Sequence, residues 1–306
     1  MTRERPWPTI TLSDWADTRD TLHLWTQIVG KVRLAFEPMV NHWWQVTLYV
    51  AARGLTTSLM HVGDRGLEIE FDFVDHVLDL RTTDAERAQV ALEPRSVADF
   101  YAATVDALGR LGIVVPIVPR PVEVEVAIPF DQDDQHRSYD PDAVHRYWQA
   151  LVQIHEVMVE FRSRFLGKVS PVHYFWGAPD LAVTRFSGRT APPHPGGVPN
   201  CPDWVQRLAY SHEVSSCGYW PGGDGEGMFY SYAYPEPSGF GDARVEPAGA
   251  RYDGALGEFV LPYTTVRTAP DPRAALLQFL ERTYEIAADL ADWDRAALEV
   301  GAVWRT

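Results

Sequence analysis

The hydrophobic residues of this chain follow a helical period in some segments and a strand period in others. Apolar side chains recur every three or four positions over residues 12–36, which predicts a half-buried helix that Pro38 ends. Residues 67–83 alternate between apolar and polar and predict two strands, and the apolar stretch 43–54 predicts a buried strand before them. The apolar side chains of the first alternating strand share one face: Leu67, Ile69, Phe71 and Phe73.

Capping signals mark the helices that follow. Ser96 precedes an amphipathic segment that Gly112 ends, and a short strand is expected over 113–118. Asp140 and Pro141 open a long helix ended by Gly167. Its apolar stripe is Tyr147, Leu151, Ile154, Met158, Phe161 and Phe165. Short strands are expected over 172–177, 181–188, 211–220, 228–234 and 257–263, before a last helix from Asp271 to about Leu290.

The order of these elements suggests an internal duplication. The chain has two lysines, Lys31 and Lys168, and each stands in a Gly-Lys-Val tripeptide followed by a histidine and a run of aromatic residues. We therefore predict an α+β fold of two related halves, each helix, antiparallel sheet, helix, packed with pseudo-two-fold symmetry. The halves would span residues 1–120 and 141–306, joined by a Pro-rich and acidic connection over 121–140. Both lysines are expected near helix C-termini, where the helix dipole favours a cation.

Composition excludes several functional classes. The formal net charge of −15 would repel nucleic acid and anionic membranes, so neither is expected as a partner. No apolar run reaches the roughly 20 residues that cross a bilayer, and the start of the sequence lacks the pattern of a signal peptide. Cys201 and Cys217 are too few for a disulfide framework. A soluble, cytoplasmic protein that binds a small molecule is expected.

The residues best suited to chemistry cluster between 170 and 223, around a long Pro- and Gly-rich loop. His173, His194 and His212 could together hold a divalent metal, although their spacing matches no known ligand motif. His173, His212 and Glu213 are instead candidates for general acid or base catalysis. A third interpretation makes the histidines structural.

Charged and aromatic residues of the same stretch are candidates for substrate binding. Arg185 and Arg189 flank a Ser-Gly turn and could present two guanidinium groups to an anion. The alternative is that both form ordinary salt bridges. Trp176 and Trp220 belong to a dense group of aromatic residues that could line a ligand pocket.

Several long segments resemble a known family. The segments TQIVGKVRL, NHWW, DLAVTRFSGR and SHEVSS are similar to those of a family of bacterial proteins classed only as a domain of unknown function, and the resemblance spans about residues 7–293. This resemblance implies membership but carries no activity and no catalytic residues.

These observations favour an enzyme that acts on a small polar or anionic metabolite in a His, Glu and Arg pocket of the second half, with or without a metal. The convergence of titratable groups with a long, stiff loop is the reason. Two alternatives are a non-catalytic small-molecule binding protein and a protein-interaction module. The first two predict a cavity, whereas an interaction module predicts a flat surface.

Overall fold

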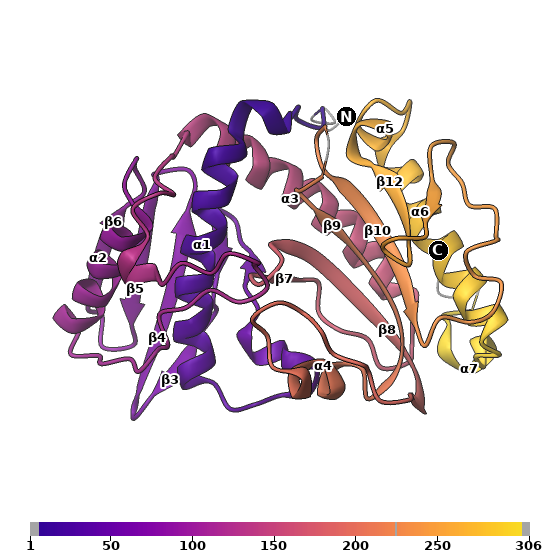
Figure 1. Cartoon of the computed structure of the whole chain (residues 1–306), viewed down its shortest axis with the longest axis horizontal. Helices are drawn as coiled ribbons and strands as arrows, with labels where there is room; N and C mark the ends of the chain where they lie inside the picture. The colour runs from indigo at the N-terminus through magenta and orange to yellow at the C-terminus, as the bar shows by residue number, and fades with distance from the viewer. Residues whose placement is uncertain (1–5, 224, 302–306) are drawn as a thin grey trace.

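The computed structural model describes residues 6–223 and 225–301 and has an α+β fold, as predicted. Its two antiparallel sheets lie side by side, with helices packed on them (Figure 1). Among the described residues, no helix is both long and apolar enough to cross a membrane.

The first half begins with a long helix, continues through short strands and ends with a second helix. Its strands pair in the order β1-β2-β4-β5-β6, with β3 also beside β4. The elements are α1 (Leu12–Phe36), the 3-10 helix η1 (Asn41–Val46), β1 (Tyr49–Val50), β2 (Gly54–Thr56), β3 (Met60–Val62), β4 (Arg65–Asp72), β5 (Val77–Thr82), β6 (Arg87–Ala91) and α2 (Val97–Arg110).

The second half follows a connection that contains the short 3-10 helix η2 (Phe130–Gln132). Its strands pair in the order β11-β12-β10-β9-β8-β7. The elements are α3 (Pro141–Ser163), β7 (His173–Phe175), β8 (Asp180–Thr190), α4 (Asp203–Ala209), β9 (His212–Trp220), β10 (Met228–Tyr234), β11 (Arg251–Asp253), β12 (Glu258–Pro262), α5 (Tyr263–Arg267), α6 (Pro272–Leu290) and α7 (Arg295–Leu298).

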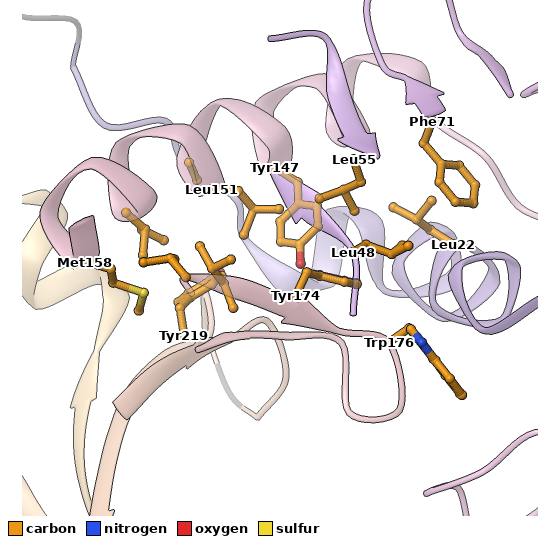
Figure 2. Packing of buried hydrophobic residues seen from close by; sticks show 14 of the residues in the cluster. Leu22, Leu48, Leu55, Phe71, Tyr147, Leu151, Met158, Tyr174, Trp176 and Tyr219 are labelled. Atoms are coloured by element: carbon orange, nitrogen blue, oxygen red, sulfur yellow. The ribbon is translucent and has the colours of Figure 1, made fainter. Parts of the chain in front are cut away.

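Alternation along the strands gives each sheet a helix-covered face. In the second sheet, α3 packs against β8 while α6 packs against β9 and β10. Tyr147, Leu151 and Met158 of α3 point toward Tyr174 and Tyr219 of this sheet (Figure 2). All five side chains are almost completely buried, so this layer is the main apolar core of the second half.

The two sheets meet edge to edge. Leu48, just before β1, exchanges both backbone hydrogen bonds with Tyr174 of β7, with N–O distances of 2.9 and 2.8 Å. These two bonds connect the first sheet to the second.

Elements with strong local signals occur where they were predicted. The first helix spans Leu12–Phe36, and Ser96 caps α2 by accepting a 3.0 Å hydrogen bond from the Asp99 amide. The strand predicted over 43–54 is wrong for its first part, because Asn41–Val46 forms η1 and strand pairing begins only at Leu48, just before β1. Residues 113–118 form no strand either and have no regular secondary structure.

Candidate functional site

A cavity of about 840 Å³ lies on the face of the second sheet opposite α3. Its floor is formed by β8, β9 and β10, and its walls come from α4, η1, the C-terminal part of α1 and the connection near residues 118–123. The volume is within the range that holds small organic ligands. Side chains from both halves therefore surround one space.

The strand period explains which residues reach this floor. In β8, Leu181, Val183 and Arg185 point toward the helices, so Asp180, Ala182 and Thr184 face the cavity. The same alternation brings Ser216 of β9 and Tyr230 and Tyr232 of β10 to the floor.

Hydroxyl and carboxyl groups form short hydrogen-bonded pairs across the floor. Tyr230 donates its phenolic hydrogen to Oδ2 of Asp180, which we call the Asp180–Tyr230 pair. The hydroxyl oxygens of Tyr210 and Tyr232 lie 2.7 Å apart. Gly218 leaves room for this arrangement, because a Cβ atom there would lie 2.4 Å from the Tyr230 hydroxyl.

The Asp180 carboxyl group is electrostatically unusual. Asp180 is only 8% exposed, and burial raises the pKa of its carboxyl group from 3.8 to about 7. The hydrogen bond from Tyr230 opposes this shift, while Glu123 and Glu258 add to it by charge repulsion. Asp180 therefore changes protonation near neutral pH.

Two further carboxyl groups in the cavity lining, those of Glu123 and Glu258, act on Asp180. Burial raises the pKa of Glu258 to about 7, with a contribution from Asp253, and burial also raises the pKa of Glu123. Glu123, Glu258 and Asp180 all line the cavity. One end of the cavity thus concentrates carboxyl groups whose pKa values are raised by burial.

Lys31 lies on a different part of the wall. It belongs to the last turns of α1, as predicted, but its side chain lines the cavity and is 7% exposed. Its Nζ atom lies 6.0 Å from the centroid of the Trp176 ring. Burial lowers the pKa of Lys31 to about 8, and the nearby Cys201 thiol opposes the shift.

Aromatic rings form much of the remaining wall. Trp43 and Trp204 pack with ring centroids 5.4 Å apart, and His194 stacks on Tyr210 at 4.6 Å. Trp176 is fixed by a 2.6 Å hydrogen bond from its Nε1 to the Val46 carbonyl oxygen. These rings favour a ligand with an apolar or aromatic body.

Backbone strain is concentrated around this cavity. Eight non-glycine residues in the described part of the chain have positive φ, and four of them line the cavity. These four are His42 (62°), Trp43 (59°), Glu123 (60°) and Asn200 (53°). Such conformations persist where surrounding packing enforces them, and they often occur at functional sites.

The sequence-predicted site residues are divided between the cavity and other places. His194, Trp176 and Trp220 line the cavity. His173 is fully buried, with a pKa lowered to about 3 by burial and then by His42, and neither ring nitrogen has a hydrogen-bond partner in the described structure.

The other four candidates lie outside the cavity. His212 and Glu213 begin β9, where His212 is exposed and Glu213 forms a 2.7 Å ion pair with Arg189. Arg185 points to the helix side of the sheet, where its Cζ lies 3.4 Å from the Phe161 ring centroid and its Nη1 lies 3.5 Å from Glu281. Both arginines therefore have the salt-bridge partners of the alternative interpretation.

The described residues do not form the predicted metal site. No group of three or more His, Cys, Asp or Glu side chains within residues 6–223 and 225–301 is placed to hold a metal ion. His173, His194 and His212 occupy three different environments, one enclosed in the core, one on the cavity wall and one in solvent.

Sequence analysis gave no specific site role to Lys31, Glu123, Asp180, Tyr230 or Glu258, although Asp180 lies within the stretch 170–223 that it singled out. One signal was present in the sequence, because Tyr230, Tyr232 and Tyr234 alternate along β10 and so had to share a face. No comparable signal exists for Lys31 and Glu123, which reach the cavity from segments far away in the chain.

Comparison with known proteins places the chain without assigning an activity. No curated protein and no solved structure matches it. A family model described as a family of unknown function (DUF5996) matches residues 7–300, which is nearly the whole chain. The chain therefore belongs to the DUF5996 family of unknown function, and the cavity with its carboxyl, lysine and aromatic residues is a feature of this member.

Proposed function

We propose that this protein is an enzyme that binds a small, partly apolar molecule in the cavity and transfers a proton through Asp180. The Asp180–Tyr230 pair carries the proposal. It lies on the floor of the cavity, and the pKa of the carboxyl group, about 7, suits an acid or base that works near neutral pH.

The environment of Asp180 is costly for a purely structural role. A buried carboxyl group that serves packing is normally paired with a cation, which lowers its pKa. Asp180 has a tyrosine partner instead, and two further acidic residues raise its pKa. This combination maintains a proton that can be given up or taken back, so it supports catalysis over simple binding.

Tyr230 has a positioning role in this proposal. Its hydroxyl group holds Oδ2 of Asp180, and its ring lies over Gly218 and stacks with Tyr232 at 6.1 Å. Removing the hydroxyl should leave the carboxyl group in the cavity but free to rotate.

A non-catalytic binding protein is the second candidate, and the aromatic wall is the observation that favours it. Either function needs a small-molecule ligand, and a cavity of about 840 Å³ suits both better than it suits a flat interaction surface. The two functions differ in whether the bound molecule leaves unchanged.

The test compares wild-type protein with Asp180→Asn and with Asp106→Asn, which alters an exposed carboxylate of α2 paired with Arg110. Each protein is incubated with a small-molecule extract of cells, and the consumed and produced compounds are identified by mass spectrometry. We expect a compound that wild type and Asp106→Asn convert equally, with a loss of about 10²-fold to 10⁴-fold in Asp180→Asn.

A compound that all three proteins bind and release unchanged would contradict the enzyme proposal and support the binding protein. A compound converted equally by all three would show catalysis that does not use Asp180. Tyr230→Phe provides an intermediate case, in which we expect weaker catalysis with retained binding.

We also propose that the halves arose by duplication and are related by a pseudo-two-fold axis near the Leu48–Tyr174 pairing. Support comes from matching rows of buried side chains that run across the paired strands. In the first sheet this row is Leu55, Phe71, Leu78 and Val90. In the second sheet it is Leu181, Tyr219, Phe229 and Leu261.

A histidine and glutamine four residues apart support the same relationship. In α1, His23 lies 2.8 Å from the Gly177 carbonyl oxygen of the second half and 3.0 Å from the Gln27 amide nitrogen. In α3, His145 donates to the Phe73 carbonyl oxygen of the first half at 2.9 Å and accepts from Gln149 at 2.9 Å. Each helix thus binds the backbone of the opposite half.

A further inference from the structure

Lys31 is a buried amine that faces the cavity without a carboxylate partner. Its side chain is 7% exposed and lines the cavity, and no salt bridge or hydrogen bond to Nζ is present among the described residues. A buried lysine normally has such a partner, because an unpaired charge is expensive to bury. The position therefore favours the neutral amine.

Close packing and a hydrogen bond fix the position of the aromatic ring beside Lys31. The indole of Trp176 lies directly on Gly30, where a Cβ atom would come within 2.1 Å of Nε1. A hydrogen bond to the Val46 carbonyl oxygen then holds this indole beside the lysine. Gly30, Lys31 and Trp176 form one wall unit that directs an amine into an aromatic space.

Burial lowers the pKa of this amine from 10.5 to about 8. At pH 8, about half of such an amine is neutral, compared with about 0.3% of an ordinary lysine. Only a neutral amine has the lone pair that attacks a carbonyl carbon, and desolvation is a recognised way to activate lysine as a nucleophile.

We propose that Lys31 is a covalent binding site that forms an imine with an aldehyde or ketone whose body is aromatic or apolar. The inference rests on the proposed function in that it uses the same cavity. It adds a reaction class, since the substrate would be a carbonyl compound held by a carbon–nitrogen bond.

The chemistry balances without an oxidant or reductant. The lone pair of Nζ forms the C–N bond while the carbonyl π pair moves to oxygen, which takes up a proton as nitrogen loses one. Nitrogen then forms the second bond to carbon with its lone pair and releases its remaining proton, and the C–O bond pair leaves with the oxygen, which takes up a proton and departs as water. The product is an imine, and hydrolysis reverses each step.

The chain supplies its own control for a trapping experiment. Lys168 is the only other lysine in the sequence. It is exposed, and its Nζ lies 5.4 Å from the Trp44 ring centroid, so it resembles Lys31 in having an indole neighbour but lies outside the cavity. A difference in the labelling rates of the two lysines therefore measures the effect of the cavity.

The experiment treats wild-type protein at pH 7.5 with benzaldehyde and sodium cyanoborohydride, which reduces an imine to a stable benzyl amine. Peptide mapping by mass spectrometry measures the rate of labelling at each lysine. We expect Lys31 to be labelled at least tenfold faster than Lys168, and we expect benzyl alcohol to slow labelling at Lys31 alone. The preference should shrink at pH 10, where ordinary lysines also lose their proton.

Equal labelling of the two lysines, or labelling at Lys168 alone, would overturn the inference. Trapping needs no turnover, so Asp180→Asn separates this inference from the proposed function. Retained labelling of Lys31 in that variant would show an imine site that is independent of the proton-transfer role. Fast labelling that persists in Lys31→Met would place the reaction elsewhere and also overturn the inference.

Discussion

Replacing Asp180 by asparagine should make the protein more stable at alkaline pH while abolishing its proposed activity. The carboxyl group has a pKa of about 7 in the folded protein and 3.8 as its reference value. The folded state therefore holds a proton that the unfolded chain releases between these values, and folding stability falls as pH rises from about 4 to 7.

The size of this effect follows from the shift. A difference of about three pKa units at 1.36 kcal/mol per unit corresponds to about 4 kcal/mol of lost stability above pH 7. Asparagine is never ionised and can still accept the Tyr230 hydroxyl through its amide oxygen, so it avoids most of this loss. We expect Asp180→Asn to gain about 2 to 4 kcal/mol over wild type at pH 8.5, and little at pH 4.5.

Urea denaturation followed by tryptophan fluorescence and circular dichroism measures the free energy of unfolding of both proteins at intervals from pH 4.5 to 8.5. The difference between them isolates Asp180, because other titrating groups are common to both. Asp106→Asn is the matched surface control and should give a difference that changes little with pH. A difference that stays flat for Asp180→Asn, or that favours wild type as pH rises, would refute the assignment of a raised pKa.

Three further changes test separate parts of the structure. Gly218→Ala places a Cβ atom 2.4 Å from the Tyr230 hydroxyl and 2.7 Å from a backbone oxygen, so the free energy of unfolding measured in urea should fall by about 1–3 kcal/mol. An unchanged denaturation midpoint would mean that the sheet can accommodate the methyl group. Arg185→Met leaves Glu281 without its buried partner and should lower the free energy of unfolding by about 3 kcal/mol. Benzaldehyde trapping at Lys31 should be unchanged, and a loss of trapping would indicate that Arg185 contributes to the cavity site. Because the pKa of His173 is lowered to about 3, the free energy of unfolding of wild type should fall by about 2 kcal/mol between pH 8 and pH 5, whereas that of His173→Phe should not show this fall. Parallel pH profiles of the two proteins in urea denaturation would contradict this expectation.

Local signals predicted the helices well because their information lies within a few residues. Asp140 accepts hydrogen bonds from the Asp142 and Ala143 amides, which is what its position before a proline indicated. The stretch 43–54 failed because hydrophobicity reports burial and not backbone conformation. His42 and Trp43 adopt positive φ, which breaks any strand, and no residue type there signals such a turn.

The site was predicted less completely because it is assembled from distant segments. A long loop and an aromatic pocket in the second half were expected, and His194, Trp176 and Trp220 do line a cavity. Arg185 was assigned to substrate binding from its residue type, although its place in the alternation of β8 puts it on the face with Leu181, which packs under α3. The alternation along a strand decides which face of the sheet a side chain occupies. A charged side chain on the helix-covered face, such as Arg185, contributes to packing and not to the cavity.

If the two sheets are related by duplication, as proposed, their faces differ in one important respect, because the second sheet forms the cavity floor. In the first sheet, the face that the proposed axis relates to the cavity floor carries Glu68, Glu70 and Arg81. Arg81 forms ion pairs with both glutamates, and Glu68 and Arg81 remain partly exposed to solvent. In the first sheet β3 and β4 are joined by the two residues 63–64, whereas β8 and β9 of the second sheet are joined by 191–211, which include α4.

That longer connection covers the second sheet, and small and aromatic residues surround Asp180 in the cavity beneath it. A covered face has a low effective dielectric, which is the condition that raises the pKa of Asp180 and lowers the pKa of Lys31. The chemistry proposed for this protein thus depends on a connection that excludes water from one face of the second sheet, and the acid and the amine acquire their reactivity from the same enclosure.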